Sequence, residues 1–283
     1  MKISKGVWLM LWASFLFTLM SACVKALPTI PAVELVWFRS LISIVLCLVA
    51  LKKNKIPFFG NNKKVLVARG LFGAVSLMVT YNVVQNIPLA TSSVLHYVSP
   101  IFTALIAFLV LGEKLYKIQW LFFAISFAGV LIMKGFDSRV ETLYLCLGIV
   151  AAFLAACAYN CIRVLKDSEH PLVIVFYFPL VTLPITSAIC LFDWVTPTGW
   201  QEWGLILAIG LLTQLAQLAM TKAYQAEEAA KIASVSYTGI IHAIIVGIIF
   251  FQEYFDWKVI AGMCLVLVGV ILNVSFKRVF RVK

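Results

Sequence analysis

Charged residues are scarce in this chain. They make up only 12% of its 283 residues, whereas 63% of the residues are hydrophobic. A soluble domain carries about 25% charged and about 45–50% apolar residues, so water cannot be the main solvent of this protein. Apolar runs of about 20 residues favour spanning helices, because barrel strands would alternate over about 10 residues. The composition therefore predicts an all-α membrane protein.

Motifs of the common membrane enzymes are also missing. The chain contains no HExxH, no GxSxG and no paired intramembrane aspartates, and its seven cysteines lie in apolar runs without metal-type clusters. A formal net charge of +11 does not indicate nucleic-acid binding, because the basic residues lie between apolar runs and not on one solvated face. We therefore expect no enzymatic activity, no metal, no cofactor and no nucleic-acid partner.

Long apolar runs are what the sequence does contain. Breaking the chain at charges, prolines and glycines leaves ten segments long enough to cross a bilayer as helices. The connections between them are short, so none holds a soluble domain. The predicted spans run roughly over residues 6–26, 32–51, 65–86, 91–111, 118–135, 143–163, 172–191, 203–223, 231–251 and 258–276.

Lysine and arginine placement predicts the orientation, because cytoplasmic loops carry the excess of these residues. An even number of spans puts both termini on one side of the membrane. With that side cytoplasmic, only Lys25, Arg39, Lys134, Arg139 and Lys258 lie outside or within the membrane, out of 23 basic residues. We therefore expect a multi-pass protein of the cell inner (plasma) membrane with both termini in the cytoplasm.

A repeat relates the two halves of the chain at a constant offset of 140 residues. Each copy holds five spans, an odd number, so the second copy would lie upside down relative to the first. Secondary transporters have this architecture, with the site near the midplane between the copies. We expect the first repeat over residues 1–137 and the second over residues 138–283. The aligned pairs include Ala90 with Ala230, Tyr97 with Tyr237, Glu113 with Glu253, and Gly129 with Gly269.

Short motifs mark the first repeat: Lys25, Phe38-Arg39, Ala90, Tyr97, Pro100, Gly112-Glu113 and Gly129-Val130. Across nearly the whole chain this pattern resembles the EamA-type permeases of the drug/metabolite transporter (DMT) superfamily. The second copy departs from it at Gly239-Ile240 and Gln252-Glu253. The resemblance implies ten helices, a central cavity lined by both repeats, and transport of small organic metabolites. The Trp37-Phe38-Arg39-Ser40 stretch looks closest to a subgroup that includes S-adenosylmethionine uptake carriers.

The predicted function is a secondary transporter that works by alternating access. An amino-acid-like zwitterion, an organic anion and an S-adenosylmethionine-like solute are the candidate substrates, and import and export both stay open. A channel, a receptor or a scaffold is the alternative, against which the absence of a repeated filter motif and of a long loop both count. The expected partners are a small-molecule substrate and the lipid bilayer, and a homodimer stays open.

Arg39 is the sharpest candidate for a substrate-binding or gating residue. It lies inside an apolar span, where a bare charge costs about 2.5–3.5 kcal/mol on insertion scales. Its counterpart in the second half is Pro179, and this asymmetry favours a specific task such as binding a carboxylate. The alternatives are that Arg39 snorkels outward or pairs locally with Glu34.

Charged and aromatic residues supply further candidates for substrate binding or gating. Lys25 and Glu34 flank the outer ends of the first two spans near Arg39, where they form either a charge cluster that opens and closes with access or solvated loop charges. Tyr97 and Tyr237 are repeat counterparts, so inversion would bring two phenols together. They either face a cavity, which suits an amphipathic substrate, or pack between helices.

Histidines, prolines and polar side chains complete the candidate set. His96 and His242 are not repeat counterparts, and each either senses protons or forms a neutral hydrogen bond between helices. Pro100 and Pro179 remove backbone hydrogen bonds, so we expect hinges or tolerated kinks there. The remaining candidates are polar residues within spans, which line a cavity or join neighbouring helices. They are Tyr81, Asn82, Gln85, Asn86, Gln214 and Gln217.

Overall fold

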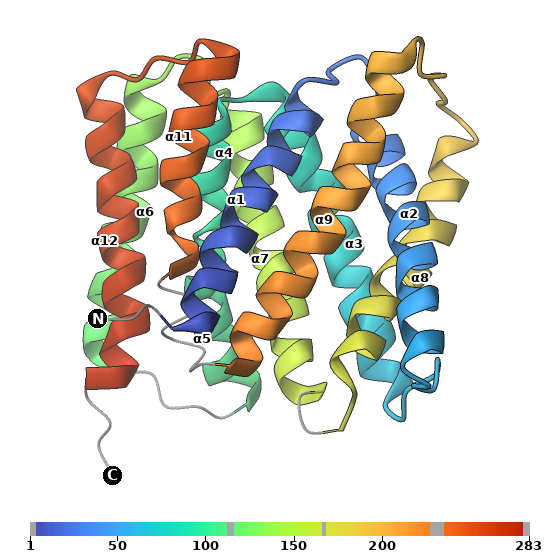
Figure 1. Ribbon diagram of the computed structural model, residues 1–283. Coiled ribbons are helices and arrows are strands. Elements are labelled where there is room, and N and C mark those ends of the chain that lie inside the picture. The colour runs from blue at the N-terminus through green and yellow to red at the C-terminus, as the bar shows by residue number, and fades with distance from the viewer. Residues whose placement is uncertain (1–3, 112–115, 166–167, 227–234, 280–283) are drawn as a thin grey trace.

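The computed structural model describes residues 4–111, 116–165, 168–226 and 235–279, and all regular secondary structure in these ranges is helical (Figure 1). The first half contributes α1 (Lys5–Lys25), α2 (Ala32–Lys53), α3 (Lys63–Asn86), α4 (Leu89–His96), α5 (Ser99–Leu111) and α6 (Lys117–Phe136). The second half contributes α7 (Thr142–Leu165), α8 (Pro171–Cys190), α9 (Trp200–Ala226), α11 (Thr238–Phe251) and α12 (Trp257–Val279). The prediction of an all-helical protein is confirmed.

Seven stretches in the described ranges are long and apolar enough to cross a membrane, and shorter apolar stretches lie in α6, α11 and α12. Large apolar side chains also cover the outside of the bundle: Val110 is 74% exposed, Phe250 71% and Leu131 68%. Exposed apolar area on this scale is unfavourable in water and matches a hydrocarbon solvent. The protein is therefore a multi-pass membrane protein.

A break divides the predicted span 91–111 into α4 and α5. Pro100 has no backbone N–H, so it cannot donate to the carbonyl of His96, four residues earlier. The α-helix stops at His96, a tighter turn carries the chain through Tyr97 and Val98, and the Val98 N–H donates to the Leu95 carbonyl at 3.1 Å. In contrast, α8 continues through Pro179 without interruption.

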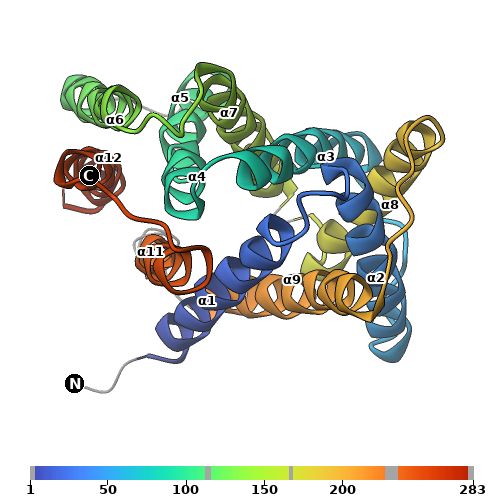
Figure 2. The ribbon, with the colours of Figure 1, turned by 90° about the horizontal axis from the view of Figure 1, so that it is seen from above.

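Helices of the two halves pack mainly against each other. The most extensive pairs are α6 with α12, α1 with α9, α3 with α7 and α2 with α8, and the pairs of α3 with α8 and of α2 with α9 follow. Figure 2 shows the α6–α12 pair at one edge of the bundle and the α2–α8 pair at the opposite edge. One apolar cluster lies where α4, α6, α7, α11 and α12 meet, and a second lies where α1, α2, α3 and α9 meet.

Glycines allow α6 and α12 to approach closely. A Cβ atom added at Gly129 would lie 2.7 Å from the carbonyl oxygen of Gly262, and one added at Gly262 would lie 2.9 Å from that of Gly129. Without a hydrophobic driving force between helices in lipid, such contacts through small residues are a main source of helix association. The seam therefore holds the last helices of the two halves together.

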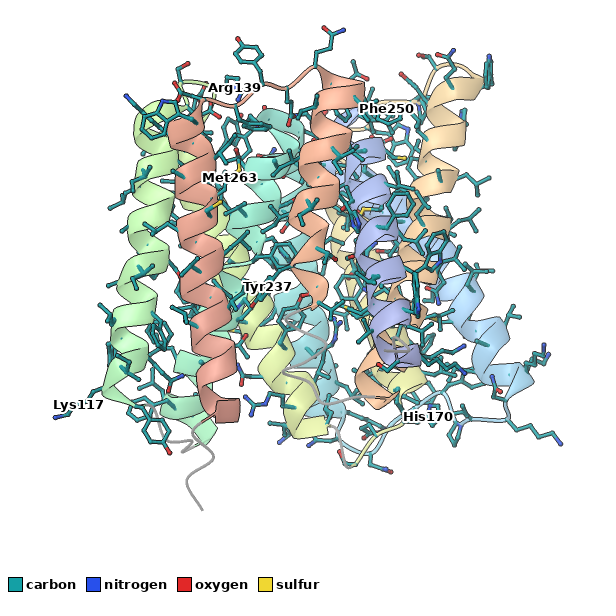
Figure 3. The ribbon with its side chains drawn as sticks, turned by 60° about the vertical axis from the view of Figure 1, so that its left-hand side comes forward. Lys117, Arg139, His170, Tyr237, Phe250 and Met263 are labelled. Atoms are coloured by element: carbon teal, nitrogen blue, oxygen red, sulfur yellow. The ribbon has the colours of Figure 1, made fainter. Side chains whose placement is uncertain are left out.

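The bundle has two ends with different loops. We call the end where α1 begins the N-terminal end and the end where α1 finishes the distal end. Helix α12 finishes at the N-terminal end as well (Figure 1). Figure 3 shows Lys117 and His170 at the N-terminal end, Arg139 at the distal end, and Tyr237 between them. Most charged residues of the described ranges thus lie near the ends of the bundle.

Candidate functional site

Arg39 is buried inside the bundle on α2. The residue is only 4% exposed, and its Nε donates to the Thr213 hydroxyl of α9 at 3.1 Å. Its Nη1 is buried and has no hydrogen-bond partner among the described residues. No ion pair joins it to Glu34 in that part of the chain. The interpretations of Arg39 as an outward-snorkelling or Glu34-paired residue are therefore wrong.

Arg69 of α3 is a second buried guanidinium, and the sequence analysis missed it by assigning it to the cytoplasmic flank. The residue is 8% exposed, and its Nε and Nη1 are both buried without a hydrogen-bond partner in the described ranges. Arg39 and Arg69 face the same ring: their Cζ atoms lie 5.2 Å and 4.8 Å from the ring centroid of Phe178 on α8. We call Arg39, Arg69, Phe178 and Thr213 the arginine cluster.

Gly73 makes room for this arrangement on α3. A Cβ atom at this position would lie 2.7 Å from Cε2 of Phe178 and 2.8 Å from Nη1 of Arg69. Real Cβ contacts are essentially never this short. Only glycine therefore allows the Phe178 ring and the Arg69 guanidinium to pack against α3 as they do.

No acidic side chain among the described residues is paired with the arginine cluster. A guanidinium within the apolar region costs about 2.5–3.5 kcal/mol on insertion scales, and a desolvated cation–π contact returns about 2 kcal/mol. Arg39 also donates a hydrogen bond to the Thr213 hydroxyl, whereas no side-chain hydrogen bond joins Arg69 to another described residue. Each buried donor left unmade costs about 1–3 kcal/mol more. An anion between the helices would satisfy these donors.

Tyr81 on α3 and Gln214 on α9 are buried polar candidates. Tyr81 is 1% exposed, and its hydroxyl donates to the Met20 sulfur at 3.0 Å. Gln214 donates to the Cys47 sulfur at 3.6 Å. Gln217, one turn further along α9, is only partly buried.

Tyr97 and Tyr237 form a separate polar centre at the α4–α5 break. Their ring centroids lie 5.3 Å apart with the planes at 75°, and the Tyr97 hydroxyl donates to the Ser236 carbonyl at 2.7 Å. A Cβ atom at Gly239 would collide with the Tyr97 hydroxyl, so glycine is needed there. The repeat counterparts do meet, and they pack edge to face between the halves near mid-height of the bundle (Figure 3).

The two histidines differ in their neighbours. The His96 ring is 6.0 Å from the Tyr97 ring, and the His242 ring on α11 meets the Phe15 ring of α1 edge-on at 5.6 Å. In each case Nδ1 is buried without a hydrogen-bond partner among the described residues, although both residues are only partly buried. His96 thus joins the tyrosine centre, whereas His242 lies between α1 and α11.

Lys25 joins a different acid from the one expected. Its Nζ lies 3.3 Å from a carboxylate oxygen of Glu253 and donates to the Ile87 carbonyl at 2.6 Å. The same carboxylate accepts from the Leu89 N–H, with distances of 2.8 Å and 3.1 Å to its two oxygens, at the start of α4. The charge cluster of Lys25 with Glu34 and the alternative of two solvated loop charges are therefore both wrong. Glu113, the repeat counterpart of Glu253, lies outside the described residues, as does Ala230.

Glu34 is buried at the start of α2 with 0% exposure. One carboxylate oxygen accepts from the Val195 N–H at 3.0 Å, and the other is buried without a partner among the described residues.

A separate ion pair lies elsewhere at the distal end. Arg139 Nε lies 2.9 Å from a carboxylate oxygen of Asp137. That hydrogen bond raises the pKa of Arg139 above its ordinary value.

A cleft of about 370 Å³ opens at the distal end between the α1–α2 loop and the last turns of α3. Asn82, Gln85 and Asn86 line it, and Gln85 also donates to the Leu27 and Ile30 carbonyls at 2.8 Å and 2.9 Å. These bonds hold the loop against α3. The polar residues predicted near this end thus line a peripheral cleft and do not join the arginine cluster.

Apolar helices that surround buried guanidiniums, with no acidic partner among the described residues, are typical of a membrane protein with a substrate or ion pathway. The family is shown by comparison: the sequence model of the EamA-like transporter family matches residues 4–134 and, a second time, residues 142–275. The chain belongs to this family, and the resemblance drawn from its sequence is confirmed.

Named relatives are transporters too. The chain is 35% identical over 271 residues to the pseudopaline exporter CntI of Pseudomonas aeruginosa, covering 95% of each chain. It is 27% identical to the mouse solute carrier family 35 member G1, over 93% of this chain and 76% of that protein. A solved crystal structure aligns with a TM-score of 0.71 over 99% of this chain and 100% of its own, at 15% identity, which shows the shared fold alone.

Proposed function

We propose that this protein is a secondary carrier that exports a small organic metabolite bearing a carboxylate, with Arg39 binding that carboxylate. The observation that carries the proposal is the burial of the Arg39 guanidinium with an unsatisfied Nη1. Guanidinium and carboxylate match in geometry and form hydrogen bonds about twice as strong as neutral ones. A substrate that brings the missing acceptor gains this interaction only inside the protein.

Alternating access is supported by the pairing of helices. An offset of 140 residues relates α1 to α7 and α3 to α9, so the α1–α9 pair corresponds to the α7–α3 pair. The α2–α8 and α6–α12 pairs correspond to themselves. This is the pattern that two inverted repeats, residues 1–137 and 138–283, would produce about a two-fold axis in the membrane plane. Rocking of one repeat against the other would expose the site to each side in turn.

The substrate class follows from the charges at the site. A cation would be repelled by Arg39 and Arg69, and no acidic side chain in the described ranges is paired with either. Of the candidate substrates, the organic anion and the amino-acid-like zwitterion thus fit better than an S-adenosylmethionine-like solute. The direction rests on the relative named as a pseudopaline exporter, which supports export.

The orientation completes the proposal. The N-terminal end of the bundle carries Lys5, Lys52, Lys53, Lys63 and Lys117. Because cytoplasmic flanks carry the lysine excess, we place this end in the cytoplasm and the protein in the inner (plasma) membrane. Substrate would then enter from the N-terminal end and leave from the distal end.

The test compares metabolites inside and outside cells that express wild type, Arg39→Ala, Lys53→Ala or no carrier. Lys53 is an exposed cation on the same helix, so Lys53→Ala is the matched control for charge loss. We expect wild type and Lys53→Ala to lower the internal level of a carboxylate metabolite, and Arg39→Ala to do so at least tenfold more slowly at equal membrane expression. If Arg39→Ala exported it as fast as wild type, the role of Arg39 would be wrong. If no metabolite differed between wild type and empty cells, the carrier function itself would fail.

A further inference from the structure

We propose that Arg69 is a second substrate-binding residue, and that Arg39 and Arg69 together select a metabolite with two carboxylates. The inference rests on the proposed carrier function and names the substrate class of the same site. It assigns a role to a residue whose sequence position, near the start of a helix with a lysine-rich flank, looks like ordinary membrane anchoring.

The two guanidiniums lie close enough together to contact one ligand. Both Cζ atoms lie within 5.2 Å of one ring centroid, that of Phe178, so the guanidiniums are at most twice that distance apart. They come from α2 and α3, and Phe178 comes from α8. One small molecule can therefore reach both arginines at once.

The two guanidiniums together present several hydrogen-bond donors that no described residue satisfies. Arg39 Nη1, Arg69 Nε and Arg69 Nη1 are all buried without a hydrogen-bond partner in the described part of the chain. A single carboxylate has two oxygens and one negative charge, so at one arginine it would leave the other guanidinium charged and unsatisfied. Two buried cations facing one ring are neutralised only by two negative charges, which gives a dicarboxylate the advantage over a monocarboxylate.

Both arginines of the cluster come from the first half of the chain, and the second half has no arginine at the corresponding positions. At the offset that relates the repeats, Arg39 corresponds to Pro179 and Arg69 to Ile209. Phe178 has a counterpart in Phe38, but Phe38 packs against Trp37, Trp194 and Trp203 and not against an arginine. A purely architectural arginine pair would be expected twice in a repeated fold. The two charges instead converge from one half onto a ring of the other.

The experiment measures which metabolite the cells export and how many carboxylates it carries. Cells express wild type, Arg69→Gln, Arg69→Lys or Lys53→Gln, with membrane levels matched. We expect the exported compound to bear two carboxylates. Arg69→Gln should slow its export roughly tenfold to a hundredfold, because one charged hydrogen-bond donor group is lost. Arg69→Lys should restore part of the rate, and Lys53→Gln should match wild type.

A second measurement separates binding from folding. Purified protein in detergent is heated with glutarate, or with its monoamide at the same concentration, because ligand binding raises the Tm by mass action. We expect glutarate to stabilise wild type more than the monoamide does, and Arg69→Gln to lose this difference.

The outcomes distinguish the two proposals. Export of a compound with a single carboxylate, at an unchanged rate in Arg69→Gln, would overturn the dicarboxylate inference and leave the carrier function standing. Equal stabilisation of wild type by glutarate and its monoamide would count against the inference in the same way. If wild type exported nothing that empty cells retain, the proposed function would fail, and the inference with it.

Discussion

Replacing Gly73 with alanine tests whether the arginine cluster depends on close packing against α3. The added Cβ atom would lie 2.7 Å from Cε2 of Phe178 and 2.8 Å from Nη1 of Arg69. Ordinary contact begins near 3.4 Å. Both the ring and the guanidinium must therefore move by several tenths of an ångström, away from the helix and toward the space where we place the substrate.

The expected magnitude combines two effects. Inserting a methyl group into a packed site costs about 1–3 kcal/mol, while alanine is about 0.8–1.0 kcal/mol better than glycine within a helix. The net loss of stability should thus lie between about zero and 2 kcal/mol. Displacement of about 1 Å can slow a catalysed step about 100-fold, and a shift of the size required here should slow transport about tenfold. Function should therefore fall more than stability.

The assay is metabolite export together with the Tm of the purified protein. Gly204→Ala is the matched control, because a Cβ atom at Gly204 on α9 would meet nothing within 4 Å. We expect Gly204→Ala to keep wild-type export and a Tm equal to or above that of wild type. If Gly73→Ala also kept wild-type export, the placement of the substrate against Phe178 and Arg69 would be refuted.

Two further predictions concern the distal end and the orientation. Glu253→Gln removes the negative charge that Lys25 and the Leu89 N–H share. A charged hydrogen bond contributes about 1.5–3 kcal/mol, so this variant should have a measurably lower Tm than wild type. An unchanged Tm would show that the contact contributes nothing to stability. Phe192→Cys, 92% exposed at the distal end, should react with a membrane-impermeant maleimide in intact cells, whereas Lys53→Cys should react only after lysis. The opposite result would invert the proposed topology.

Local sequence was enough to predict most of the helices. In hydrocarbon every backbone N–H and C=O must be satisfied within its own segment, so apolar runs of sufficient length become helices whatever surrounds them. The start and end of α2, α3 and α8 therefore fall within a few residues of the predicted spans. The missing N–H of a proline marked Pro100 and Pro179 alike, and only the structure shows that the helix breaks at the first and continues through the second.

The site was predictable only in part. The cost of a charge in an apolar span pointed correctly to Arg39 as a buried residue. Arg69 escaped notice because it lies only two turns from the lysines that begin α3, and flanking arginines commonly extend to the membrane surface. The charge and hydropathy pattern of α3 does not distinguish an arginine that extends outward from one that turns inward toward Phe178. A search for arginines on the same helix face as Gly73 is the one signal that would have suggested it.

What the sequence determined by itself was the class of solvent, the helical segments, the family and the residues that pair by repeat. What only the tertiary structure decided was the choice of partners: Arg39 with Thr213, 174 residues apart, Lys25 with Glu253, and two arginines with one phenylalanine. The physical reason is that the length of an apolar run determines whether that one segment forms a spanning helix. The partner of a buried charge depends instead on which helices from distant parts of the chain pack beside it.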